Sequence, residues 1–180
     1  MQTDPVRRTL TVAPPARTEG APTLAAAARQ AARVALRWIS EPDCTEELTH
    51  DELLDQAARA AAALTRLGVR AGDRVAVHLP LVPESVIATL ACGQIDAVRS
   101  SLPVGLQAHE LRERLSTLDA AVVITADAEH LAGEVRPMKP VMDRALAGCP
   151  GVRNVLVVHR AARPVPWRPG RDLWWHEALR

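Results

Sequence analysis

The side chains that could do chemistry are few and lie far apart along the chain. Six of the 180 residues are histidine and three are cysteine, at Cys44, Cys92 and Cys149. The cysteines form no CxxC pair and no histidine stands in a zinc-binding pattern, so the sequence predicts no metal site. Cys92 falls on a predicted helix, where a small buried hydrophobic side chain is a better interpretation than a nucleophile.

Phosphate chemistry also lacks its usual residues. The nine glycines are scattered, no two are adjacent, and no Gly-Lys pair occurs. A loop that wraps phosphates with backbone N–H groups needs clustered glycines and usually a lysine. Lys139 is the only lysine in the chain. We therefore predict no catalytic residue in this sequence.

The stretch from Ala71 to Val98 predicts the unit around which the fold is built. Val75 to Leu79 is a short apolar run typical of a buried strand, and Pro80 ends it. A helix follows from Pro83, since the first turn of a helix tolerates proline. Its apolar residues recur at helical spacing at Val86, Ile87, Leu90, Ala91 and Ile95. A strand, a helix and the entry to another strand predict a βαβ unit and hence a parallel sheet.

Strands and helices alternate along the rest of the chain. We expect strands at residues 98–102, 120–125 and 154–158, and helices at 24–33, 50–67, 108–118 and 140–147. Thr49 and Glu52 form a capping-box pattern before the second of these helices. An edge strand is expected at 34–39 and a loop at 126–136. The predicted fold is α/β, a three-layer sandwich with a mostly parallel sheet.

The sequence divides into two parts. Residues 1–23 contain four prolines and no periodicity, so we expect a disordered or loosely attached arm. Residues 24–180 are expected to form one domain, large enough to bury a core. Near the end of that domain, Trp174 and Trp175 are expected to pack under a neighbouring subdomain.

Composition excludes several classes of protein. The net charge of +1 and the 2% aromatic content argue against binding to nucleic acid. No run of about 18 apolar residues occurs, so no membrane span is predicted. The widely spaced cysteines suit a reducing compartment, and we expect a cytoplasmic protein.

Several separated motifs, in order, resemble one family. The run GDRVAVHLPLVPESVIATLACGQIDAV (72–98) is similar to the AMP-forming acyl-CoA synthetases. So are AAVVITAD (120–127) and the stretch 137–158 with its GCP and VLVV. The run PWRPGRDLWW (166–175) resembles the acetyl-CoA synthetase subgroup, which uses acetate or propionate. The resemblance covers residues 34 to 178 and implies the N-terminal subdomain of such an enzyme.

The resemblance implies a two-step reaction for an intact member. A carboxylate attacks ATP to give an acyl-adenylate and pyrophosphate, and the thiol of CoA then displaces AMP. ATP, Mg²⁺ and CoA are thus implied for the intact enzyme, while we expect this chain alone to bind none of them. The family's phosphate loop follows the DLWW stretch and its adenylation lysine lies in a C-terminal domain. Lys139 does not match that lysine.

The resemblance also implies two loops near the nucleotide part of CoA, and both depart from the family here. The first reads Pro103-Val104-Gly105-Leu106, where only Gly105 matches the family's Phe-Gly-Gly-Phe. In the second, Leu131 and Glu134 occupy positions where the family has cations, which opposes phosphate binding. Asp96 stands where the family has glycine, at a position expected to have positive φ.

Three functional hypotheses remain. The first is a truncated or split synthetase homologue that is inactive by itself and is completed by a second synthetase fragment or by a second copy of the chain. The second is a non-catalytic interaction module that docks to a full-length synthetase or another partner. A free-standing nucleotide-binding protein ranks last, because it would need a glycine-rich loop at the carboxyl ends of its strands.

Overall fold

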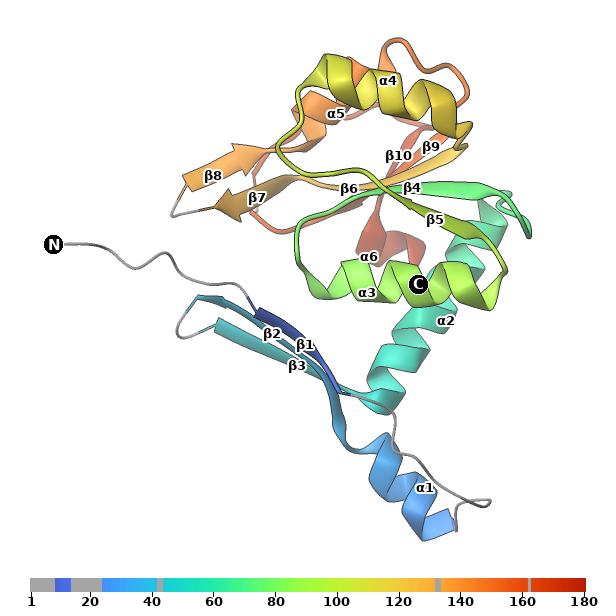
Figure 1. Cartoon of the computed structure of the whole chain (residues 1–180), viewed down its shortest axis with the longest axis vertical. Helices are drawn as coiled ribbons and strands as arrows, with labels where there is room; N and C mark the ends of the chain where they lie inside the picture. The colour runs from blue at the N-terminus through green and yellow to red at the C-terminus, as the bar shows by residue number, and fades with distance from the viewer. Residues whose placement is uncertain (1–8, 14–23, 42–43, 132–133, 162) are drawn as a thin grey trace, which may run out of the picture.

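The computed structural model describes residues 9–13, 24–41, 44–131, 134–161 and 163–180 (Figure 1). The helices of this part are α1 (Leu24–Ala31), α2 (His50–Arg66), α3 (Pro83–Gln94), α4 (Ala108–Leu118), α5 (Lys139–Leu146) and α6 (Trp175–Ala178). None of them has the length and apolar character that crossing a bilayer requires.

A five-stranded parallel sheet forms the centre of the fold. Its strands are β4 (Arg74–His78), β5 (Val98–Ser101), β6 (Val122–Ala126), β9 (Asn154–Val158) and β10 (Asp172–Trp174), in the order β10-β9-β6-β4-β5. The three inner strands are almost wholly buried, as expected for Val- and Ile-rich runs covered on both faces. β5 and β10 are the edges.

Helices cover both faces of this sheet, which confirms the three-layer α/β prediction. One apolar core holds Leu111, Leu115 and Met142 from α4 and α5. The other holds Leu64 from α2 and Ile87 from α3, with Trp175 from α6. Figure 1 shows α4 and α5 on one side of the sheet and α2, α3 and α6 on the other. Trp175 is 5% exposed and so packs within its own chain, not under a neighbour as predicted.

A smaller antiparallel sheet lies beside this sandwich. It consists of β1 (Thr9–Val12), β2 (Val34–Glu41) and β3 (Cys44–Thr49) in that order. Strand β1 falls inside the predicted arm, where residues 9–12 pair with β2; residues 1–8 and 14–23 of the arm lie outside the described residues. Trp38 of β2 donates a hydrogen bond to the carbonyl of Leu81 at 2.7 Å and thereby ties this sheet to the sandwich.

Two local predictions are confirmed. The Thr49 hydroxyl accepts a hydrogen bond from the N–H of Glu52 at 3.3 Å, and the Glu52 carboxylate accepts one from the N–H of Thr49 at 2.8 Å, completing the capping box of α2. Asp96, just after α3, has a φ of 53°, in the left-handed region that favours glycine.

One other prediction is wrong, and one strand was not predicted. Residues 126–136 are not a loop, because β7 (Ala128–Leu131) and β8 (Glu134–Pro137) form an antiparallel hairpin there. Their sequences, AEHL and EVRP, lack the apolar alternation that signals a strand. Residues 172–174 form a further strand that was not predicted, and it pairs in parallel with β9. A three-residue strand leaves too short a pattern to be recognised.

Candidate functional site

The carboxyl edge of the parallel sheet is the candidate site, because ligands of open α/β sheets bind outside the carboxyl ends of the strands. Both loops that the sequence analysis singled out lie at this edge. Residues 102–107 follow β5, and the β7–β8 hairpin follows β6. The end of β4, at His78, lies between them in the strand order.

The loop after β5 turns at Gly105. This residue has a φ of 81°, and a Cβ built on it would meet no atom within 4 Å. Backbone conformation, not crowding, is therefore what favours glycine at this position. The neighbouring Val104 is 40% exposed. Gln107 then caps α4, its N–H donating to the Glu110 carboxylate at 2.7 Å. A role for Gly105 in cofactor binding stays a prediction.

The hairpin brings together the two positions where the resemblance implies cations. Leu131 and Glu134 face each other across the β7–β8 pair. Leu131 is 42% exposed, and Glu134 has an Arg136 nitrogen 3.7 Å from its carboxylate. Ala132 and Gly133, between them, lie outside the described residues. At the described positions the hairpin end thus presents an apolar and an acidic side chain, which does not suit a phosphate.

Asp127 fixes the base of this hairpin. Its carboxylate is buried and accepts hydrogen bonds from the N–H groups of Ala128 at 2.7 Å, Arg160 at 2.8 Å and Ala161 at 3.0 Å. With three backbone donors bound, the carboxylate holds the hairpin against the segment after β9. Asp127 is therefore a structural residue and not a free acid or base.

His78 and Thr125, near the carboxyl ends of the central strands β4 and β6, are also inaccessible. His78 Nδ1 lies 3.2 Å from the Thr125 hydroxyl, and the two residues are 2% and 0% exposed. Burial lowers the pKa of His78 to about 4, so the imidazole is uncharged near neutral pH. A fully covered threonine cannot serve as a nucleophile for a bound substrate. His78 Nε2 is buried, and no described residue is within hydrogen-bonding reach of it.

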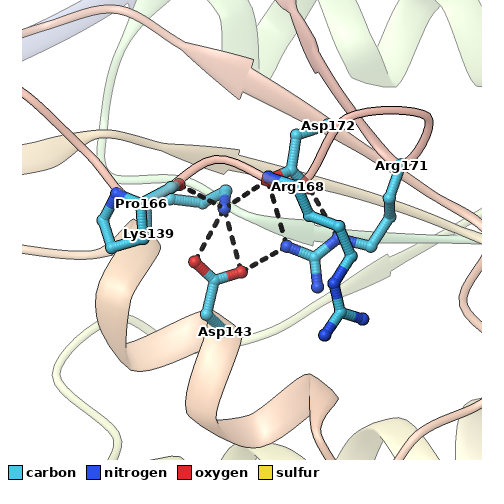
Figure 2. Close-up of polar contacts among 6 residues, drawn as sticks. All are labelled: Lys139, Asp143, Pro166, Arg168, Arg171 and Asp172. Carbon is cyan, nitrogen blue, oxygen red and sulfur yellow. Dashed lines mark hydrogen bonds and ion pairs between the residues drawn. The ribbon is translucent and has the colours of Figure 1, made fainter.

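Lys139 occupies a charge cluster that the sequence analysis missed (Figure 2). It is 0% exposed, and its Nζ donates to Asp143 at 2.7 Å and to Asp172 at 2.7 Å. The carbonyl of Pro166 accepts a third hydrogen bond at 3.1 Å. Arg171 contacts the same two carboxylates. The ammonium group is thus fully occupied and cannot reach a phosphate.

The protonation of Asp172 fits this description. Burial alone would raise the pKa of its carboxyl, but hydrogen bonds from Arg171 and Lys139 lower the pKa below its ordinary value. The cluster joins α5 to the segment before β10 and holds that edge strand in place. The i, i+4 spacing of Lys139 and Asp143 indicates an ion pair on a helix and could have been recognised in the sequence. Nothing in the sequence indicates the contact with the distant Asp172.

The remaining reactive side chains do not build a site. Cys92 and Cys149 are buried free thiols, and burial raises the pKa of each, which makes them poor nucleophiles. The buried position of Cys92 confirms its prediction as a core residue. No group of three or more metal-ligating side chains occurs among the described residues.

An apolar pocket of about 180 Å³ lies away from the carboxyl edge, between the small sheet and helices α2 and α3. It is lined by Val12, Ala13, Gln30, Arg33, Val34, Ala35, His50, Leu53, Leu54, Val86 and Leu90. This lining contains no carboxylate and no thiol, so the pocket offers no acid–base pair or nucleophile.

Comparison with known proteins agrees with these features. Residues 24–176 match the family model described as AMP-binding enzyme. The acetyl-coenzyme A synthetase of Streptomyces avermitilis is 46% identical over 145 residues, which is 81% of this chain and 22% of that protein. Acetyl-coenzyme A synthetase 1 of Candida albicans is 44% identical over 140 residues, 77% of this chain and 21% of that protein. The chain thus spans about a fifth of the length of these curated relatives.

Proposed function

Because the chain belongs to the AMP-binding enzyme family, we propose that it forms the N-terminal part of an acetyl-CoA-synthetase-like ligase for acetate or propionate. The observation that carries this proposal is the match over residues 24–176, supported by identities of 46% and 44% to two acetyl-coenzyme A synthetases. In such an enzyme, ATP and Mg²⁺ would serve the adenylation step and CoA the thioester step. The cytoplasmic location expected from the cysteines stays a prediction.

We propose further that residues 1–180 do not adenylate a carboxylate by themselves. No glycine-rich loop and no Gly-Lys pair occurs in this sequence. Lys139 supports the proposal, because its ammonium group is buried between Asp143 and Asp172. Stabilising a pentavalent phosphorus needs preorganised donors aimed at the developing charge, and neither Lys139 nor the described end of the β7–β8 hairpin supplies them.

The adenylation proposal is tested by ATP–pyrophosphate exchange on the purified chain. We expect no exchange with acetate or with propionate, while a full-length acetyl-CoA synthetase assayed alongside gives a strong signal. Preparations made with two different affinity tags control for a contaminating host enzyme. Exchange that stays proportional to the amount of this chain in both preparations would overturn the proposal.

We expect the chain to bind CoA weakly or not at all, because the end of the β7–β8 hairpin lacks the two cations that the resemblance implies. The 3′-phosphate and pyrophosphate of CoA need several charge-assisted hydrogen bonds, each worth about 1.5–3 kcal/mol. Without the two cations, binding should be weaker by about two to four decades. In calorimetric titration we expect no heat from the unmodified chain and weak, salt-sensitive binding from the double variant Leu131→Arg, Glu134→Lys. Tight binding by the unmodified chain would mean that these two residues do not face CoA.

A second candidate function is a non-catalytic module that docks to a synthetase. It is favoured by the aromatic side chains beside the edge strand β10, where Trp167 is 38% exposed and stacks on Trp174 with ring centroids 4.7 Å apart. Co-purification with a full-length acetyl-CoA synthetase, reduced by Trp167→Ala, would favour this candidate. No association at micromolar concentrations would count against it.

A further inference from the structure

Arg99, Ser85 and Ser101 form a cluster between the edge strand β5 and α3. Figure 1 shows α3 on one face of the sheet beside β5. Arg99 and Ser101 are two residues apart on this strand, so their side chains point to the same face of the sheet. The Arg99 guanidinium donates a hydrogen bond to the hydroxyl oxygen of Ser101 at 2.5 Å. It donates another to the hydroxyl oxygen of Ser85, in the first turn of α3, at 3.2 Å.

The cluster contains donors and no anion. No carboxylate forms an ion pair with Arg99 among the described residues. The nearest acid in the sequence to Ser85 is Glu84, and its carboxylate pairs with Arg160. Each serine oxygen accepts from Arg99, so each hydroxyl proton remains available to another acceptor. Arg99 Nε is buried and has no hydrogen-bond partner in the described part of the chain, so this part of the guanidinium is desolvated without compensation there.

The positive charge of Arg99 affects the pKa of a nearby thiol. Burial raises the pKa of the nearby Cys92 thiol and the charge of Arg99 opposes that rise. Ser101 is exposed, which opens the cluster to solvent at the end of β5. A charged group that is half-buried, lacks an acid partner and is accessible from one side suits an anionic ligand.

We propose that Arg99, Ser85 and Ser101 form a binding site for a phosphate group. The guanidinium bridges two hydroxyl groups, one on β5 and one in the first turn of α3, and each hydroxyl keeps a proton to donate. The several oxygens of a tetrahedral oxyanion can accept from the guanidinium and from both hydroxyls, and a planar carboxylate offers fewer acceptors. The proposal does not depend on the ligase function, because it uses no residue of the two CoA loops.

The test is a titration of the 180-residue chain with inorganic phosphate, followed by calorimetry and by thermal unfolding. Sodium chloride at matched ionic strength is the control for general charge screening. We expect saturable binding with phosphate and none with chloride. Glycerol phosphate forms a second arm: binding of both ligands indicates a site for phosphate esters, and binding of inorganic phosphate alone indicates a site for the free ion.

Variants locate the binding. Arg99→Gln should weaken phosphate binding by about 10- to 100-fold, the loss expected for one charge-assisted contact. Ser85→Ala leaves the guanidinium in place and should weaken binding by a smaller factor. Arg59→Gln, on the exposed Arg59–Asp55 pair of α2, is the matched control and should bind like the unmodified chain. Absence of saturable binding, or equal binding by Arg99→Gln in a folded variant, would overturn the proposal.

Discussion

Two clusters that contain buried or half-buried cations have opposite surroundings in this molecule. Lys139 and Arg171 lie against Asp143 and Asp172, so two positive charges meet two negative charges. Among the described residues, Arg99 meets the hydroxyl groups of Ser85 and Ser101 and no carboxylate. The first cluster is compensated and joins α5 to β10. The second is uncompensated and open to solvent. The difference separates a charge that holds the fold together from one that is available to a ligand.

The largest expected effect comes from breaking the compensated cluster. Asp172→Ala should destabilise the protein by about 3–5 kcal/mol, because it leaves the fully buried Lys139 without one of its carboxylates. Urea unfolding followed by circular dichroism measures the loss. Glu47→Ala, in the exposed Arg37–Glu47 pair, is the control and should cost about 1 kcal/mol or less. A loss no larger than that control would show that the Lys139 cluster does not stabilise the fold.

A substitution in the apolar core provides a reference for the loss of stability in Asp172→Ala. Ile87→Ala should destabilise by about 2–4 kcal/mol, because Ile87 is 1% exposed in the core between α3 and the sheet. Leu90 is only partly buried and lines the apolar pocket, so Leu90→Ala should cost less. The same unfolding experiment measures both. Equal losses would contradict the burial difference between the two positions.

His78 provides a third buried group, one that is stable only when uncharged. Burial lowers its pKa from 6.5 to about 4, so the unfolded chain binds a proton before the folded chain does. The free energy of unfolding should therefore fall as the pH drops from about 6.5 to about 4, by about 3 kcal/mol. His78→Gln should flatten this dependence, measured by urea unfolding at several pH values. The exposed His109→Gln should leave it unchanged; an equally steep slope in His78→Gln would assign the effect to other groups.

The sandwich could be predicted from the sequence because its signals are local. Apolar strand-length runs such as residues 154–158, the proline of α3 and the capping box of Thr49 and Glu52 each depend on a few neighbouring residues. The β7–β8 hairpin could not be predicted. Its polar strands are held by Asp127, whose partners at Arg160 and Ala161 lie more than 30 residues away.

The charged clusters depend on contacts that the sequence does not show. Ser85 and Arg99 meet only because β5 pairs with β4 and α3 packs beside it. Asp172 reaches Lys139 only because β10 adds to the sheet next to β9. A place for Leu131 and Glu134 near CoA is implied by the resemblance alone and stays a prediction. The register of β7 and β8 adds that they face each other.

The substitution with the smallest expected effect on stability, Arg99→Gln, tests the second cluster. In chloride buffer, Arg99→Gln should change the free energy of unfolding by about 1 kcal/mol or less. The lost hydrogen bonds to two hydroxyls are offset by relief of an uncompensated charge. In saturating phosphate the unmodified chain should gain stability that the variant does not, because a ligand that binds only the folded state shifts the equilibrium. Urea unfolding of both proteins in both buffers measures the four values. A loss in chloride as large as that of Asp172→Ala would make Arg99 a structural cation like Lys139, and the distinction between the two clusters would fail.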